Sequence, residues 1–421
     1  MKVAGIRAKN FKSFDNLNYH FNNFTVVIGA NASGKSNLVS VFKFVNYVIN
    51  RGIDDAISLS GGIKYLSNHN VTSHSNIEVG IDLDLASEKG YFGLDDENYL
   101  VKPTSIEYDM SIHSTRLDRY LIETERMVIT YNIFQKGSGK SNVKDKVPLY
   151  QYECTIVNKK NTSDSDVDIK PLSTKTNKAI ENELKKPLSI IKRLSADNSE
   201  SMLYYSRLIM PPTIRNGVIQ IYDFDPKILK KPSSGESDVK LDSIGSNLAM
   251  SLKKLYMNNR GSHDTLIKYV HTLLPFIDKI DTEENLDNSI SYFIRENYSK
   301  EKYPSNHISD GTANIIALLY PLVVDSNIAT IIEEPEKNVH PALVGKYIEL
   351  LMDVSKTRQF IITTHSPTIV DLVDLGAILF LKRDESGITR LITPSDSPMV
   401  TELLKTELGA GDLFISDMIG E

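Results

Sequence analysis

One eight-residue segment near the N-terminus constrains the fold of this chain more than any other feature. It runs Gly29-Ala-Asn-Ala-Ser-Gly-Lys35-Ser36 and fits the pattern G-x-x-x-x-G-K-[ST]. A compact apolar run, Phe24–Ile28, precedes it, and an amphipathic pattern follows from Ser36 to about Ile49. The segment therefore predicts a strand, a phosphate-binding loop and a helix, which together begin a nucleotide-binding α/β sheet.

The residue types in this loop suit the binding of an anion. Glycines let the backbone curl so that successive N–H groups, at the positive end of the following helix, point at phosphate oxygens. We expect the Lys35 ammonium to reach the β- and γ-phosphates and the Ser36 hydroxyl to ligate Mg²⁺. A plain glycine turn is the alternative, and the flanking strand and helix argue against it. The candidate residues of the loop are Gly29, Asn31, Ser33, Gly34, Lys35, Ser36 and Asn37.

A second predicted strand, Ala329–Ile332, ends in two acids, Glu333 and Glu334. In nucleotide-binding α/β sheets, ligands bind at the carboxyl ends of the strands. We assign Glu333 to the metal side, where it holds the Mg²⁺ shell through water, and Glu334 to the attacking water, which it orients and deprotonates. A solvated acidic loop is the ordinary alternative for such a run.

A third predicted strand, Gln359–Thr363, leads to His365. A histidine on its own carries little information. At a strand end beside the acids of the previous strand, however, it could hydrogen-bond the γ-phosphate and report its loss. His365 is therefore a candidate catalytic residue together with Glu334.

Composition excludes several classes of protein. The chain has 421 residues, 48 Lys and Arg against 54 Asp and Glu, a net charge of -6 and a single cysteine, Cys154. One cysteine excludes an internal disulfide and a cysteine-rich zinc site, and suits a reducing compartment. The charge balance argues against a wholly basic nucleic-acid coat protein. No apolar run approaches the roughly 20 residues of a membrane span, so we expect a cytoplasmic protein without a membrane partner.

These sites together resemble those of the ABC-type ATPases of the SMC, RecF and OLD group, especially the single-chain ATPase components of bacterial anti-phage defence systems. The resemblance adds a signature motif at Ile308–Thr312, in which Ser309 and Gly311 would contact ATP. It also identifies Lys12 and Ser13, in a turn after the first strand, as residues that approach the nucleotide.

The resemblance implies ATP and Mg²⁺ as cofactors and ATP hydrolysis as the reaction. It further implies at least a homodimer, since in this group the signature helix of one copy completes the ATP site of another. The expected fold is α/β, an ABC-type P-loop ATPase head split by a mostly helical insertion. We expect residues 1–90 to form the N-terminal part of the head, 91–289 the insertion, with strands and then helices, and 290–421 the C-terminal part.

Two functions are open from the sequence. The first is a sensor or scaffold ATPase of an anti-phage defence system, which responds to a phage protein and holds or activates a separate effector nuclease. The second is an SMC/RecF-like DNA-binding repair ATPase. OLD nucleases carry a Toprim domain after the head, and the stretch after His365 is too short for one. The pair Asp223 and Asp225 is the best remaining candidate for a metal centre, and we interpret it as a structural loop. The acidic balance favours the defence function.

Overall fold

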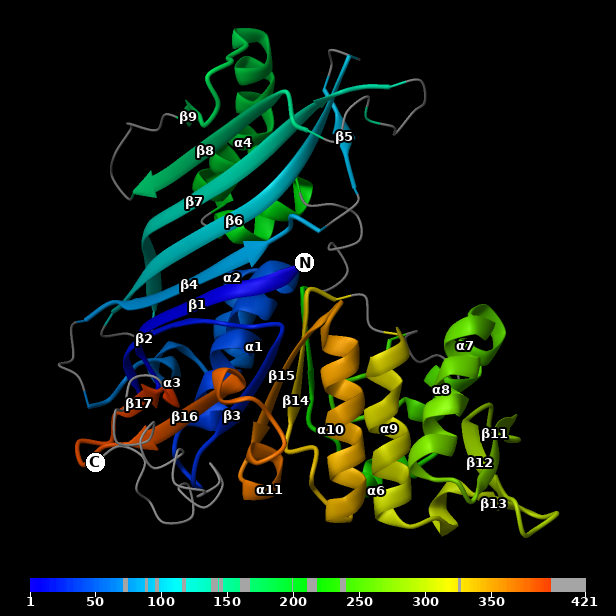
Figure 1. Cartoon of the computed structure of the whole chain (residues 1–421). Helices are drawn as coiled ribbons and strands as arrows, with labels where there is room; N and C mark the ends of the chain where they lie inside the picture. The colour runs from blue at the N-terminus through cyan, green and yellow to red at the C-terminus, as the bar shows by residue number, and fades with distance from the viewer. Residues whose placement is uncertain are drawn as a thin grey trace.

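The computed structural model describes residues 1–394, with gaps at 71–74, 88–89, 95–97, 116–118, 138–142, 144–146, 160–166, 199, 210–217, 235–239 and 325–326. The described part of the chain contains a large antiparallel sheet, a mainly parallel sheet and a small antiparallel sheet. Figure 1 shows the large sheet above the parallel one, and the small sheet to one side.

The large sheet has the strand order β2-β1-β4-β6-β7-β8-β9, and β5 pairs with β6. Its inner face is apolar because buried residues alternate along the strands, as Tyr152, Cys154 and Ile156 do along β8. The strands are β1 (Lys2–Phe11), β2 (Phe14–His20), β4 (Ile77–Asp84), β5 (Phe92–Gly93), β6 (Tyr99–Ser114), β7 (Tyr120–Gln135), β8 (Tyr150–Lys159) and β9 (Asp168–Pro171).

The second sheet has the order β10-β14-β15-β3-β16-β17, parallel throughout except for the edge strand β17. The central strands β3 and β15 are buried along their whole length and apolar at their centres, as is usual where helices or sheets cover both faces. The strands are β3 (Phe24–Ile28), β10 (Ile219–Tyr222), β14 (Ala329–Glu333), β15 (Gln359–Thr364), β16 (Ile378–Arg383) and β17 (Thr389–Ile392).

Helix α1 (Lys35–Arg51) packs between the two sheets. Its apolar residues share one core with the inner face of the large sheet and with alternate residues of the parallel sheet, such as Val27 and Ile331. The same core takes in α4, whose buried residues lie along one side. The shorter elements near this core are α2 (Ile53–Leu59), α3 (Ile63–Leu66), α4 (Lys178–Asn198), α5 (Met202–Tyr205) and η1 (Ser206–Leu208).

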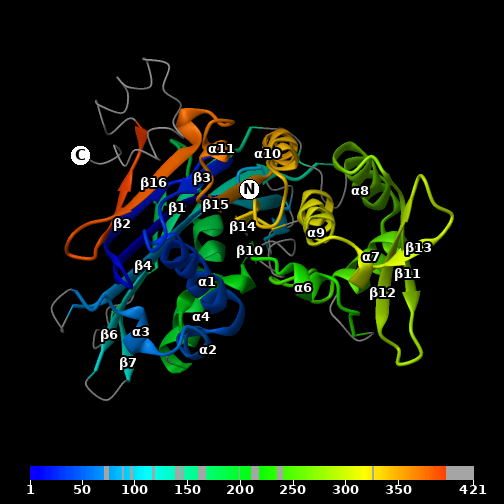
Figure 2. The ribbon, with the colours of Figure 1, turned by 90° about the horizontal axis from the view of Figure 1, so that it is seen from below.

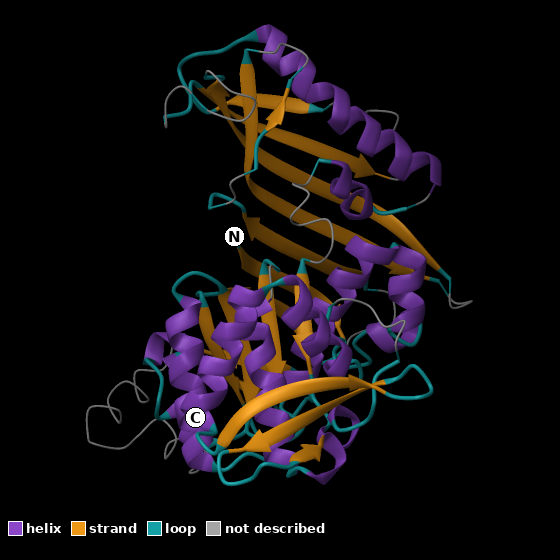
Figure 3. Cartoon of the chain, turned by 90° about the vertical axis from the view of Figure 1, so that its right-hand side faces the viewer, coloured by secondary structure: helices purple, strands orange, loops and turns teal. Residues whose placement is uncertain are grey.

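A second core covers the other face of the parallel sheet. Helices α9 (Asp310–Val324) and α10 (Pro341–Ser355) pack there against residues such as Val26 and Phe360. Figures 1 and 2 both place α9 between α10 and the helices α7 and α8. Figure 3 shows the small sheet lying over these helices. The remaining elements are α6 (Pro226–Leu229), α7 (Leu248–Asn258), α8 (Arg260–Leu273), β11 (Ile277–Glu284), β12 (Ile290–Glu296), β13 (Lys302–Pro304), η2 (Ser305–His307), α11 (Pro367–Val370) and η3 (Leu375–Ala377).

The predicted strands and helices around the motifs are confirmed, but the inserted region differs from expectation. It contains as much strand as helix, because β6 and β7 are each 16 residues long and continue the sheet begun by β1 and β4. The boundary expected at residue 90 therefore falls within one sheet. Strand β10, from within the same region, joins the parallel sheet beside β14.

Helix α4 runs through Pro187. An internal proline costs a helix a hydrogen bond and about 3 kcal/mol. Four buried residues on one side of α4, Ile180, Leu184, Leu188 and Ile191, offset that cost by packing into the first core. Within the described residues, no helix is long and apolar enough to cross a membrane.

A buried carboxyl joins the large sheet to the helices beneath it. Glu125 on β7 is 1% exposed, and its Oε1 accepts hydrogen bonds from the Tyr108 hydroxyl, from Ser201 Oγ at 2.9 Å and from the backbone N–H of Met202 at 2.9 Å. Burial raises the pKa of Glu125 to about 7, although these three donors act to lower it.

This carboxyl should make the stability of the protein depend on pH. Because the folded pKa lies above the ordinary value of 4.5, the stabilisation is complete below that value, is lost as the pH rises to about 7, and changes no further above it. Glu125→Gln keeps an acceptor for the three donors and carries no charge. Between pH 5 and 8 the parent should lose about 2–3 kcal/mol of unfolding free energy relative to this variant, measured by urea denaturation. Glu107→Gln, at an exposed position of β6, is the control, and parallel curves for parent and Glu125→Gln would contradict the assignment.

Candidate functional site

The carboxyl ends of five parallel strands lie side by side and form one edge of the parallel sheet. Each end leads into a polar or charged residue, which is the arrangement expected of a ligand site in this class of sheet. In strand order, the residues are Asp223 after β10, Glu333 and Glu334 at and after β14, Thr364 and His365 at and after β15, the phosphate loop after β3, and Arg383 at the end of β16.

A pocket of about 210 Å³ lies at this edge. It opens above the first turn of α1 and is bordered by the loop, by the acidic strand end and by a cation from β16. The lining residues are Asn31, Ala32, Ser33, Gly34, Lys35, Ser36, Asn37, Glu334 and Arg383. The phosphate loop and the predicted base Glu334 therefore meet at one cavity.

Two glycines shape the loop. Gly34 has φ 111°, in the left-handed region, and a Cβ there would overlap the side chain of Thr389. A Cβ on Gly29 would meet the Leu381 carbonyl oxygen at 2.5 Å and overlap Ser33 Oγ. Gly34 is also the N-cap of α1 and has no side chain to cap it. The first N–H groups of α1 are thus left for an anion.

The Lys35 ammonium lies folded onto the loop. Its Nζ donates to the carbonyl oxygens of Gly29 at 2.6 Å and Ala30 at 3.0 Å. Burial lowers the pKa of Lys35, while the carboxylates of Glu334 and Glu336 act to raise it. A phosphate in the pocket would offer this ammonium stronger, charge-assisted hydrogen bonds than the two carbonyls do.

A hydroxyl network fastens the loop to two distant segments. Ser13 Oγ lies 2.7 Å from Thr389 Oγ1 and accepts from Asn37 Nδ2 at 2.7 Å. Thr389 Oγ1 in turn donates to the Ser33 carbonyl oxygen at 3.0 Å. Ser13 and Asn37 thus meet beside the loop, as residues of one site should.

Lys12 is the other residue of the predicted turn. Its side chain contacts helix α1 and does not line the pocket. Its Nζ donates to Ser40 Oγ at 2.9 Å, and its backbone has φ 49°. Burial, and next the nearby Lys43 ammonium, lower the pKa of Lys12.

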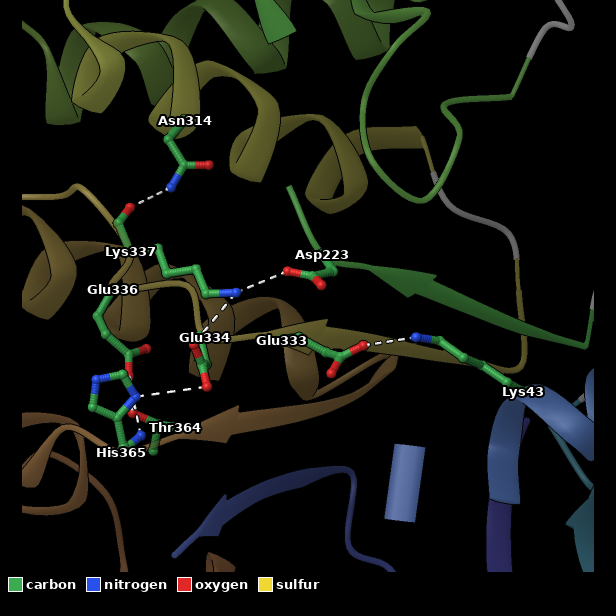
Figure 4. Close-up of polar contacts among 9 residues, drawn as sticks. All are labelled: Lys43, Asp223, Asn314, Glu333, Glu334, Glu336, Lys337, Thr364 and His365. Carbon is green, nitrogen blue, oxygen red and sulfur yellow. Dashed lines mark hydrogen bonds and ion pairs between the residues drawn. The ribbon is translucent and has the colours of Figure 1, made fainter. Parts of the chain in front are cut away.

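Figure 4 shows the acidic strand end and the residues that contact it. Glu333 Oε1 accepts from Lys43 Nζ of α1 at 3.0 Å. Glu334 has a cation or imidazole near each carboxylate oxygen, with Lys337 Nζ 3.3 Å from Oε2 and His365 Nδ1 3.7 Å from Oε1. The two predicted catalytic residues, Glu334 and His365, are therefore neighbours.

A third acid, Glu336, fixes the end of β15. Its Oε1 accepts from Thr364 Oγ1 at 2.6 Å and from the backbone N–H of His365 at 3.1 Å. The His365 imidazole also lies 3.6 Å from the same oxygen. Glu336 thus sets where His365 stands relative to Glu334.

The residues at the pocket fit a metal ion that binds together with the phosphates of a nucleotide. Ser36 and Glu334 line the pocket, whereas Glu333 is paired with Lys43. Among the described residues, no group of three or more His, Cys, Asp and Glu side chains is placed to hold a metal by itself. Mg²⁺ commonly binds through one or two carboxylates together with substrate phosphates and water, and the site offers that partial set.

The signature motif does not reach the pocket of its own chain. Ser309 Oγ caps α9 by accepting from the backbone N–H of Thr312 at 3.1 Å. Lys230 forms an ion pair with Asp310, and a Cβ on Gly311 would lie 2.7 Å from the Asn338 carbonyl oxygen. Neither Ser309 nor Gly311 is among the lining residues.

Four residues at this edge were missed from the sequence. Arg383 ends a strand at the same edge as His365, and that position could have identified it. Lys337 follows the acidic strand end and could have been considered as its counter-charge. Lys43 and Thr389 carry no local signal, because one is an ordinary helix lysine and the other a threonine in an unmarked strand.

Comparison of the chain with solved structures finds heads of SMC proteins. The SMC head bound to the C-winged helix domain of ScpA is 14% identical, with a TM-score of 0.52 over 93% of this chain and 98% of that one. The SMC head domain from Thermotoga maritima is 14% identical, with a TM-score of 0.42 over 93% and 99%. An SMC head with an extended coiled coil, bound to the C-terminal domain of ScpA from Pyrococcus furiosus, is 12% identical, with a TM-score of 0.46 over 96% and 99%.

The first of these structures shows that this chain shares the α/β fold of an SMC head. Curated proteins give no significant match. A family model described as an AAA ATPase domain matches residues 1–370, most of the chain. With its phosphate loop and acidic strand end at one pocket, the chain belongs to this AAA ATPase domain family and is an ATP-binding and ATP-hydrolysing enzyme.

Proposed function

We propose that this ATPase is the sensor and scaffold of an anti-phage defence system. It works as a homodimer or larger assembly, responds to a phage protein, and holds or activates a separate toxic effector, which is a nuclease. The resemblance of its motif set to the ATPase components of such systems supports this role. Hydrolysis serves to change the state of the assembly and not to make a product.

One observation supports assembly into a homodimer or larger form. The signature motif at the N-terminus of α9 lies apart from the phosphate-loop pocket of its own chain. The pocket has a phosphate loop and a base, but the N-terminus of α9, with Ser309 and Gly311, does not line it. A helix N-terminus favours an anion, so this second phosphate-binding surface is available to the nucleotide of another copy. Two copies would then complete two sites reciprocally.

The residues at and beside the pocket have distinct parts in hydrolysis. The N–H groups of the loop and the Lys35 ammonium bind the β- and γ-phosphates, and Glu334 accepts a proton from the attacking water. His365, held by Glu336 beside Glu334, contacts the γ-phosphate and is released when it leaves. Mg²⁺ bound with the nucleotide, near Ser36 and through water to Glu333, would neutralise phosphate charge.

The open face of the large sheet bears on the alternative, a DNA-binding repair ATPase. A groove of about 600 Å³ lies on this face and contains several cations. Arg7, however, pairs with Asp82 at 2.5 Å and Asp109 at 2.7 Å, and Lys9 lies 3.5 Å from Glu78. Two of the four cations that line the groove are thus matched by carboxylates, which weakens its field for phosphates and supports the defence function.

The acidic pair Asp223 and Asp225 has structural contacts. Asp225 Oδ1 caps α6 by accepting from the backbone N–H of Lys227 at 2.9 Å, while Asp223 Oδ1 lies 2.9 Å from Lys337 Nζ. The two side chains thus serve different partners. This supports placing the nuclease in a separate protein.

Two substitutions separate binding from hydrolysis. Lys35→Ala removes a charge-assisted phosphate contact and should weaken ATP binding by about tenfold or more. Glu334→Gln should retain ATP but lower kcat by about 10²-fold or more, because an amide does not take a proton from water. Nucleotide binding by calorimetry and phosphate release measure the two effects. Hydrolysis by Glu334→Gln at the parental rate would remove Glu334 from its assigned role.

The composite site can be tested at Ser309. Ser309→Asp and Ser309→Asn both preserve the cap of α9, because aspartate and asparagine are good N-cap residues. Only aspartate adds a negative charge where a neighbour's γ-phosphate would lie. Ser309→Asp should therefore bind ATP as a monomer but lose ATP-dependent association and hydrolysis, while Ser309→Asn keeps both. Sedimentation with a non-hydrolysable analogue measures association, and an ATP-induced oligomer in Ser309→Asp would contradict composite sites.

The proposal that the nuclease is a separate protein can be tested with this chain purified on its own. Alone, with ATP and Mg²⁺ or Mn²⁺, it should leave plasmid DNA and tRNA intact, because a nuclease needs several convergent carboxylates to hold its metals. Toxicity in cells should require co-expression of a second protein encoded beside it. Cleavage by the lone chain that stops in the double variant Asp223→Ala, Asp225→Ala would make this protein the effector itself.

A further inference from the structure

Lys337, three residues beyond the proposed base, joins three parts of the fold. Its Nζ lies 2.9 Å from Asp223 Oδ1, at the end of β10, and 3.3 Å from Glu334 Oε2, after β14. Its carbonyl oxygen accepts from Asn314 Nδ2 of α9 at 2.6 Å. Figure 4 shows Lys337 between these side chains.

The backbone around Lys337 is fixed at both ends. Glu334 and Asn338 have φ 45° and 58°, in the left-handed region that residues with a Cβ seldom adopt. Hydrogen bonds hold this turn, from Glu334 N–H to the Thr363 carbonyl at 2.8 Å and from Lys337 N–H to the Glu334 carbonyl at 3.0 Å. Asn314, which is 2% exposed, adds a buried anchor. Unusual conformations held from several sides concentrate at functional sites.

The charges around Lys337 are mostly negative. Glu334 and Asp223 lie within ion-pair distance of its ammonium, and ATP would bring further negative charge to the same edge. Burial acts to lower the pKa of Lys337, but Asp223 and Glu334 outweigh it and leave the pKa raised. A cation shared by the two carboxylates fixes Glu334 from the side opposite His365.

We infer that Lys337 is a positioning residue for hydrolysis, which holds the Glu334 carboxylate at the pocket while Asp223 holds Lys337. The inference rests on the proposed role of Glu334 as the base. Since Lys337 does not line the pocket, its contribution should fall on the rate of hydrolysis and not on the affinity for ATP.

The test is a comparison of kcat and nucleotide affinity in Lys337→Met, with the full chain as the protein. A base moved from its position costs about ten- to a hundredfold in rate, so kcat should fall by that factor while the Kd for a non-hydrolysable ATP analogue changes by less than about threefold. Lys337→Arg keeps the cation and should restore most of the rate. Asp223→Asn should lower kcat in the same direction, because Lys337 then loses its second anchor.

Lys356→Met is the matched control, because Lys356 also forms an i,i+3 ion pair, with Asp353 at 2.8 Å, at the exposed end of α10. It should leave kcat unchanged. An unchanged or increased kcat in Lys337→Met, or a loss that Lys337→Arg does not restore, would overturn the inference. If Glu334→Gln also hydrolyses ATP at the parental rate, the proposed role of Glu334 as the base fails first, so the two failures can be told apart.

Discussion

The register of the parallel sheet is the constraint on which the site depends. Strands β10, β14, β15, β3 and β16 pair in parallel and end at the same edge. Parallel pairing brings strand ends together whatever their separation in sequence, so an acid, a histidine, a phosphate loop and an arginine meet without being near one another along the chain. A shift of one strand relative to its neighbour would take its end residue out of the site.

Helix α1 links the phosphate loop of the parallel sheet to the large sheet. It begins in the phosphate loop and is buried on both sides, by the parallel sheet and by the inner face of the antiparallel one. Lys43 of the same helix pairs with Glu333, and Lys12 of the β1–β2 turn contacts Ser40. The large sheet is therefore connected to the nucleotide pocket through this helix, in addition to the contacts of Ser13 with Thr389 and of Val3 with Gln359.

The sequence predicted the parts of the site that are encoded locally. The phosphate loop, Glu333, Glu334 and His365 each follow a strand whose apolar pattern is visible in a few residues. Thr389 was missed because its role depends on a partner far away in sequence, Ser13. Lys337 has one local partner, Glu334, but its second partner, Asp223, is also distant in sequence. The 16-residue strands β6 and β7 and the entry of β10 into the parallel sheet depend on pairing, which a single sequence does not reveal.

The position of β3 has a consequence for how the protein is made. This strand carries the phosphate loop, yet its two neighbours, β15 and β16, belong to the last part of the described chain. Gln359 of β15 also binds the backbone of Val3, 356 residues away in sequence. During synthesis the loop therefore emerges long before the strands that flank it. Residues up to Arg383, which lines the pocket, must therefore be synthesised before the pocket can form around the phosphate loop.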